Sequence, residues 1–199
     1  MRVGRSFGIC IGILAITMSS GCSDSDAEAI TVDDHVFNVP REYLIEERIP
    51  WLPQSEEKGL LFHTNPKAPV REKISVLVES RSITCRDEDA STQLARHCAN
   101  EEGLIEDGSL DWENVKKIEP NGDPTQWTYV YESKGRAPVT IASCFAMADG
   151  ENGLCTVLGS YTDLVYSFRV RDSEIARIPE INNLVTALLS SWDKQERPE

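Results

Sequence analysis

The sequence lacks a long hydrophobic run and an excess of basic residues. Its most apolar stretch, residues 7–18 (FGICIGILAITM), is shorter than the roughly 20 residues that a helix needs to span a bilayer. The chain of 199 residues has 20 lysines and arginines against 33 aspartates and glutamates, a formal net charge of −13. Such a balance argues against binding to nucleic acid or to anionic lipid surfaces, and it favours a basic partner or serves solubility.

The sequence also lacks the common catalytic motifs. It has no G-x-S-x-G elbow, no phosphate-binding loop and no G-x-G-x-x-G, and its three histidines (His35, His63 and His97) are not spaced as in a zinc hydrolase. His35 follows Asp33 and Asp34, but we expect a histidine in such a turn to be solvated. We therefore expect no enzymatic activity, no cofactor and no bound metal.

None of the six cysteines lies in a C-x-x-C pair, which argues against a zinc site. Four of them follow the N-terminal segment, an even number suited to an oxidising compartment: Cys85, Cys98, Cys144 and Cys155. Cys144 and Cys155 flank the turn sequence ADGENG and can face each other on neighbouring strands within the Cα separation that a disulfide allows. We predict two disulfides, Cys144–Cys155 and, by elimination, Cys85–Cys98.

The N-terminus indicates a secretory signal peptide, because two arginines precede the apolar stretch and small residues follow it. It resembles a bacterial lipoprotein signal, which it matches at Gly21 and Cys22 and departs from at Ser19, where that signal usually has an aliphatic residue. The resemblance implies that Cys22 is acylated, for example with palmitate, and becomes the first residue. Ser23, in place of aspartate, implies the outer membrane, with the protein facing the periplasm. Ordinary cleavage, giving a soluble periplasmic protein, is the alternative.

The expected organisation is a signal peptide at 1–21, a tether at 22–28 and one domain at 29–199. Removal of the signal peptide takes away two arginines and no acid, so the mature chain carries a formal charge of −15. The remaining length is enough for one domain with a sizeable core.

The domain is predicted to be α+β. Residues 30–40 predict two short strands around the Asp33–Asp34 turn, and residues 59–63 and 73–84 predict further strands. Four runs in the C-terminal half predict an antiparallel meander: 127–131, 139–147, 154–158 and 164–170. Residues 178–192 have apolar side chains at helical three-and-four spacing, so we expect an amphipathic helix that packs across one sheet face.

Several of these features occur together in a known group of proteins. They are two cysteine-bearing strands, the run LVYSFRV, a terminal helix ending near Trp192, and HVFNVPREYLI followed by a tryptophan–proline stretch. Over residues 29–63 and 125–192 the chain resembles small periplasmic lipoproteins encoded beside type VI secretion effectors, where they act as immunity proteins. The resemblance implies a membrane-anchored protein that binds a toxin and neutralises it by occlusion. A structural or assembly lipoprotein of the cell envelope is the alternative.

Under this resemblance, an acidic surface covers a basic cleft of the toxin, with Trp112 as an aromatic anchor. The predicted partner-binding residues are Glu101, Glu102, Glu106, Asp107, Asp111, Trp112 and Glu113. The competing interpretation is a solvated acidic loop in which Trp112 belongs to the core.

Overall fold

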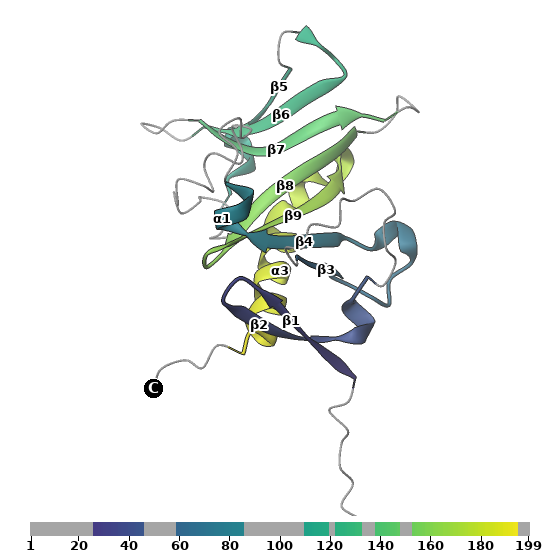
Figure 1. Ribbon diagram of the computed structural model, residues 1–199. Coiled ribbons are helices and arrows are strands. Elements are labelled where there is room, and N and C mark those ends of the chain that lie inside the picture. The colour runs from purple at the N-terminus through teal and green to yellow at the C-terminus, as the bar shows by residue number, and fades with distance from the viewer. Residues whose placement is uncertain are drawn as a thin grey trace, which may run out of the picture.

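The computed structural model describes residues 26–45, 59–85, 110–119, 122–132, 138–147 and 153–194 (Figure 1). It contains a two-stranded hairpin, a seven-stranded antiparallel sheet and one long C-terminal helix. The strands are β1 (Ala27–Val32), β2 (His35–Pro40), β3 (Leu60–His63), β4 (Ser75–Ser80), β5 (Val115–Ile118), β6 (Gln126–Tyr131), β7 (Val139–Ala146), β8 (Gly153–Tyr161) and β9 (Leu164–Arg171). The α-helices among the described residues are α1 (Arg81–Thr84) and α3 (Ile178–Trp192).

The hairpin β1–β2 forms as predicted around the Asp33–Asp34 turn. Its register pairs Val32 with His35 and Ala27 with Pro40. Asp33 has a φ of 52°, a left-handed conformation that aspartate tolerates better than most side chains do. Since β1 begins at Ala27, the last two residues of the predicted tether lie in this strand.

The large sheet has the strand order β3-β4-β9-β8-β7-β6-β5. The run β6 to β9 is the predicted meander, in which each strand pairs with the next along the chain. The sheet is larger than predicted because β4 pairs with β9, joining Val76 to Phe168 across the sequence. On the opposite side, β5 adds a short edge strand beside β6.

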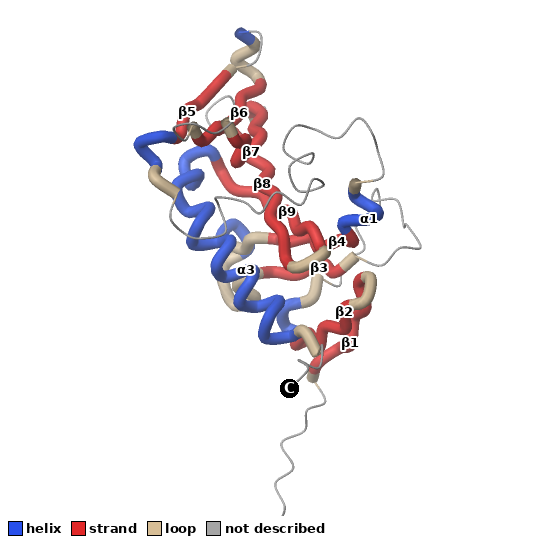
Figure 2. The backbone as a smooth tube through the Cα atoms, turned by 90° about the vertical axis from the view of Figure 1, so that its left-hand side faces the viewer, coloured by secondary structure: helices blue, strands red, loops and turns tan. Residues whose placement is uncertain are grey.

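Helix α3 covers one face of this sheet, as Figure 2 shows. Its sequence begins with proline in the first turn, where the missing N–H has no helical partner to lose. The Tyr166 hydroxyl donates to the Asn182 side-chain oxygen at 3.2 Å, and the rings of Phe62 and Trp192 meet edge to face at 5.0 Å. The helix and the inner face of the sheet therefore form the hydrophobic core.

The close approach of strands β8 and β9 requires glycine at one position of this core. A Cβ atom on Gly159 would lie 2.2 Å from Cζ of Tyr166, the residue directly opposite on β9. The missing side chain therefore leaves the space that the buried Tyr166 ring occupies.

The α+β prediction is wrong in its proportions, because the protein is mostly β. Within the described residues α3 is the only α-helix longer than four residues, whereas the sheet holds seven strands rather than four. The predicted strand at 73–84 ends at Ser80, after which the backbone turns into α1.

The prediction of two disulfides also requires correction. The described residues contain one complete disulfide, Cys144–Cys155, whose partners face each other on β7 and β8 as predicted. Cys85 is disulfide-bonded, but Cys98, its predicted partner, lies outside the described residues.

Among the described residues, no helix has both the length and the apolar character needed to cross a membrane.

Candidate functional site

The sheet face opposite α3 is hollowed into a cavity of about 870 Å³. Strand register fixes which side chains line it. Leu61 faces Leu77 across β3 and β4, and Leu77 faces Ser167 across β4 and β9. These residues alternate with buried core residues such as Phe62 and Phe168, so they point away from the helix. We call this cavity the outer-face hollow and define it by Leu61, Lys73, Leu77, Leu154, Arg169 and Arg171.

The rim of the outer-face hollow is mostly basic, although the chain is strongly acidic. Its described charged residues are Glu72, Lys73, Arg169, Arg171, Glu174 and Arg177. Arg177 is neutralised locally, because its guanidinium lies 2.9 Å from Glu174 and 3.4 Å from Glu180, and the hydrogen bond to Glu180 raises its pKa. Arg169 and Arg171 are exposed, and their side chains form no ion pair within the described part of the chain. Within the described part of the chain, the hollow therefore presents two guanidinium groups that form no ion pair.

The floor of the hollow is apolar. Leu61, Leu77 and Leu154 are half-buried there, and Thr156 and Ser167 add hydroxyl groups between them. An apolar floor with a few directed polar groups is the usual composition of a ligand or partner site, and the volume lies in the usual range.

A serine–histidine pair lies at the edge of the hollow. Ser75 and His63 face each other across β4 and β3, with Ser75 Oγ 3.3 Å from His63 Nδ1. Burial, together with the charge of Lys73, lowers the pKa of His63, so the ring is neutral at pH 7. The described hydrogen bonds include no carboxylate on this imidazole, so the pair lacks the third group that orients a catalytic histidine.

Four of the predicted partner-binding residues lie outside the described residues: Glu101, Glu102, Glu106 and Asp107. The other three begin a 3₁₀ turn at Trp112–Asn114. The Asp111 carboxylate accepts from the Glu113 backbone N–H at 3.1 Å and from the Asn114 side chain at 2.8 Å. Trp112 is half-buried against the core, while Asp111 and Glu113 are exposed. The Trp112 ring therefore takes part in core packing, and a partner-binding role for this segment stays a prediction.

His35, expected to be solvated, is instead buried, with 2% of its surface exposed. Its Nδ1 lies 2.7 Å from Asp193 Oδ2 and its Nε2 lies 2.6 Å from Asp163 Oδ1. We call these three residues the His35 clasp. They join the β1–β2 hairpin to the β8–β9 turn and to the end of α3, three parts of the fold that are far apart in the sequence.

The electrostatics of the clasp favour a positively charged imidazole. Burial alone lowers the pKa of His35, but hydrogen bonds to Asp193 and Asp163, together with their charges, outweigh burial and raise it. Burial alone raises the pKa of Asp163, but hydrogen bonds from His35 and Thr162 outweigh it, so this pKa is lowered. With both ring N–H groups donated to carboxylates, His35 has no free lone pair with which to act as a base.

A second polar cluster surrounds Asp172 at the end of β9. Its carboxylate accepts from Trp127 Nε1 at 3.0 Å and from the Tyr129 hydroxyl at 2.8 Å. Burial and this hydrogen bond raise the pKa of Tyr129 to about 12. Lys117 completes the cluster, 3.8 Å from Asp172 and 4.0 Å from the centre of the Trp127 ring. The cluster therefore ties the edge strand β5 and its neighbour β6 to the end of β9.

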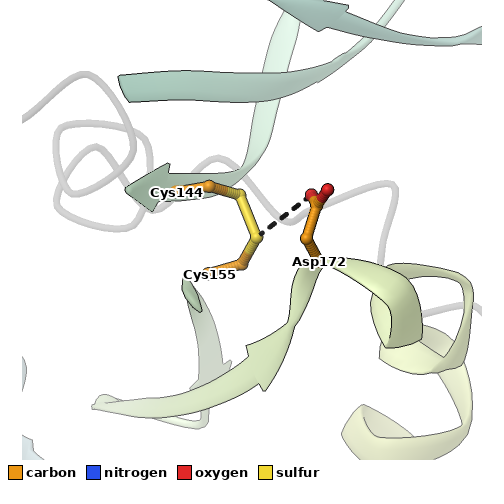
Figure 3. Close-up of side chains that lie close together, drawn as sticks. All are labelled: Cys144, Cys155 and Asp172. Atoms are coloured by element: carbon orange, nitrogen blue, oxygen red, sulfur yellow. Dashed lines mark hydrogen bonds between the residues drawn. A yellow bond between two sulfur atoms is a disulfide. The ribbon is translucent and has the colours of Figure 1, made fainter. Parts of the chain in front are cut away.

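Figure 3 shows that Asp172 also faces the Cys144–Cys155 disulfide, with a carboxylate oxygen 3.8 Å from the Cys155 sulfur. Two sulfurs and a carboxylate this close could hold a metal ion if the cysteines were thiolates. The sulfurs are bonded to each other, so neither offers a thiolate and neither carries a proton to donate. The contact is therefore one of packing.

Sequence reasoning missed the outer-face hollow. Arg169 and Arg171 alternate with Phe168 and Val170, and this alternation marks one polar face of a strand without indicating a cavity. The feature of the sequence that could have indicated the site is the concentration of positive charge on this strand, in a chain of net charge −13.

No protein-family model matches this chain, and no curated protein matches its sequence. Among solved structures it is similar to Smlt3025, described as an immunity protein of the Stenotrophomonas maltophilia type IV secretion system. The TM-score is 0.39 and the identity 10%, over 85% of this chain and 94% of that chain. At this identity the two chains share few residues, so no residue role is transferred from Smlt3025 to this chain.

Proposed function

We propose that this protein is an immunity protein of the cell envelope that binds a delivered toxin and neutralises it by occlusion. The observation that carries the proposal is the outer-face hollow, where exposed arginines surround half-buried leucines on the sheet face opposite α3. Arginine is one of the residue types that most often dominate protein–protein binding energy.

The polar clusters of the described chain support binding rather than catalysis. The His35 ring is buried, and both of its nitrogens are occupied by carboxylates. The Asp172 carboxylate is occupied by Trp127, Tyr129 and Lys117. Each cluster thus stabilises a junction between strands, which is the role expected in a rigid binding protein.

The cellular location and the secretion system follow from the sequence resemblances. An acylated Cys22 at the outer membrane would hold the protein in the periplasm, where a toxin that attacks the envelope arrives. The type VI system and a basic toxin cleft are the finer parts of this proposal. Glu101, Glu102, Glu106, Asp107, Asp111, Trp112 and Glu113 are the residues proposed to cover that cleft.

The test is protection of cells from a toxin encoded by a neighbouring gene. The toxin, exported to the periplasm, is expressed with and without this protein, and growth is followed. An inactive toxin variant is then mixed with the purified protein to measure complex stoichiometry. Restored growth together with a stoichiometric complex supports the proposal. Unprotected growth contradicts it, and stable association with resident envelope proteins instead favours the scaffold alternative.

A further inference from the structure

The outer-face hollow has a charge opposite to that of the whole chain. The protein carries −13, yet the described rim of the hollow has four cationic residues and two acidic ones. One of the cations, Arg177, is already paired with Glu174 and Glu180. The guanidiniums of Arg169 and Arg171 are exposed and form no ion pair with the described residues. A partner that enters this hollow would thus meet positive charge at short range.

The spacing of these two arginines defines the shape of a complementary ligand. They are two residues apart on β9, so their side chains leave the same face of the sheet about 7 Å apart. An extended peptide presents alternate side chains at the same repeat. Carboxylates on alternate residues of an extended segment can therefore reach both guanidiniums, and arginine binds carboxylate with two parallel hydrogen bonds.

The hollow also favours a particular kind of side chain next to the carboxylates of the bound peptide. Ser167 precedes the two arginines on the same face of β9, and it lies next to Leu77 and, one strand further, Leu61. An apolar side chain two residues before the first carboxylate would reach this leucine pair. The volume of about 870 Å³ is large enough for a short peptide segment.

We infer that the outer-face hollow binds an extended, acidic segment of a partner protein, with its carboxylates on Arg169 and Arg171 and an apolar side chain on the leucine floor. This inference rests on the proposed function, since it names the chemistry of the partner at this site. Nucleic acid offers phosphates to the same guanidiniums, but two exposed arginines in a chain of charge −13 are too few to overcome long-range repulsion from a polyanion.

The direct test uses a fluorescein-labelled seven-residue peptide with leucine at its second position, glutamate at its fourth and sixth, and serine elsewhere. Fluorescence anisotropy measures its binding to the purified full chain. A matched peptide with glutamine in place of both glutamates is the control ligand. We expect the glutamate peptide to bind about tenfold more tightly than the glutamine peptide, as two partly shielded ion pairs imply.

Charge reversal then locates the site. The double variant Arg169→Glu, Arg171→Glu should lose about tenfold in affinity for the glutamate peptide and should gain affinity for a peptide with lysine at the same two positions. Lys194→Glu is the matched control, because this exposed lysine lies at the far end of α3, about 22 Å from the end nearest the hollow. The gain for the lysine peptide separates a binding role from simple misfolding of the double variant.

Three outcomes with the peptides alone overturn the inference: equal affinity for the glutamate and glutamine peptides, equal loss with Lys194→Glu, or no binding of the glutamate peptide at about millimolar concentration. Tighter binding of single-stranded DNA than of the peptide also overturns it. The proposed function is judged separately by toxin protection. If the double variant protects cells as well as the unmodified protein does, the proposed function stands but the hollow is not the toxin-binding site. If the unmodified protein gives no protection, the proposed function fails, whatever affinity the peptide shows.

Discussion

The two carboxylates of the His35 clasp should contribute unequally to stability, although they lie at similar distances from the imidazole. Asp193 Oδ2 is 2.7 Å from Nδ1 and its side chain is 9% exposed, whereas Asp163 Oδ1 is 2.6 Å from Nε2 and its side chain is 55% exposed. Water screens the exposed pair strongly and the buried pair weakly. Burial rather than distance therefore decides how much each ion pair contributes to the free energy of unfolding.

We expect Asp193→Asn to lower the free energy of unfolding by about 2–3 kcal/mol, because it removes a charge-assisted hydrogen bond inside the protein. Asp163→Asn should cost only about 0.5–1 kcal/mol, the range of exposed ion pairs. His35→Ala should cost about 3–5 kcal/mol, since it takes the positive charge away from the Asp193 carboxylate and removes the ring that stacks on Phe37 at 5.8 Å.

The clasp also predicts how stability depends on pH. Because the pKa of His35 is raised in the folded protein, its contribution is fully present below the ordinary histidine value of 6.5 and is lost as pH rises through the raised pKa. The pKa of Asp163 is lowered in the folded protein, so this residue affects stability at acidic pH. Its stabilising contribution is present above the ordinary aspartate value of 3.8 and is lost as pH falls from 3.8 through the lowered pKa. His35→Ala should remove the loss of stability on the alkaline side.

Urea denaturation at a series of pH values measures both effects, with Asp163→Asn as the matched control for Asp193→Asn. Equal destabilisation by the two asparagine variants would refute the argument from burial. An alkaline loss of stability that persists unchanged in His35→Ala would refute the assignment to this histidine.

Three further predictions concern the core disulfide, the close-packed glycine and the anchor. Replacing Cys144 and Cys155 by serine should lower the free energy of unfolding by about 3 kcal/mol, since the bond closes a loop with a sequence separation of 11; an unchanged urea midpoint would contradict this. Gly159→Ala should cost about 1–3 kcal/mol by forcing its Cβ into the Tyr166 ring, and a wild-type melting temperature would show that the ring can move aside. Cys22→Ser should move the protein from the membrane fraction to the soluble fraction without changing its unfolding curve, and continued membrane fractionation would argue against acylation.

Features encoded by neighbouring residues could be predicted from the sequence. The β1–β2 hairpin, the meander from β6 to β9, the terminal helix and the Cys144–Cys155 bond each depend on contacts within a short stretch of chain. Strand alternation and turn residues report such contacts directly.

Features that depend on distant residues were missed or misjudged. The pairing of Val76 with Phe168 enlarges the sheet, but nothing in either strand alone indicates its partner. His35 was expected in solvent because only its neighbours Asp33 and Asp34 were visible, whereas its partners are 128 and 158 residues away. Strand β5 was not predicted since its sequence, VKKI, places its apolar residues three apart rather than in alternation.

The place where the chain enters the fold has a mechanical consequence. The Arg41 backbone N–H donates to the Asp26 carbonyl at 2.9 Å, which closes the open end of the β1–β2 hairpin. A pulling force at the N-terminus would act on this hydrogen bond first. It would then act on the β1–β2 residue pairs one after another, starting at Ala27–Pro40. The hairpin would thus separate at low force, because its hydrogen bonds break one pair at a time. The seven-stranded sheet shares no strand with the hairpin, so its own hydrogen bonds would stay intact. If Cys22 is acylated and the outer-face hollow binds a partner, as proposed, the hairpin would open before the sheet and so protect the binding face from tension.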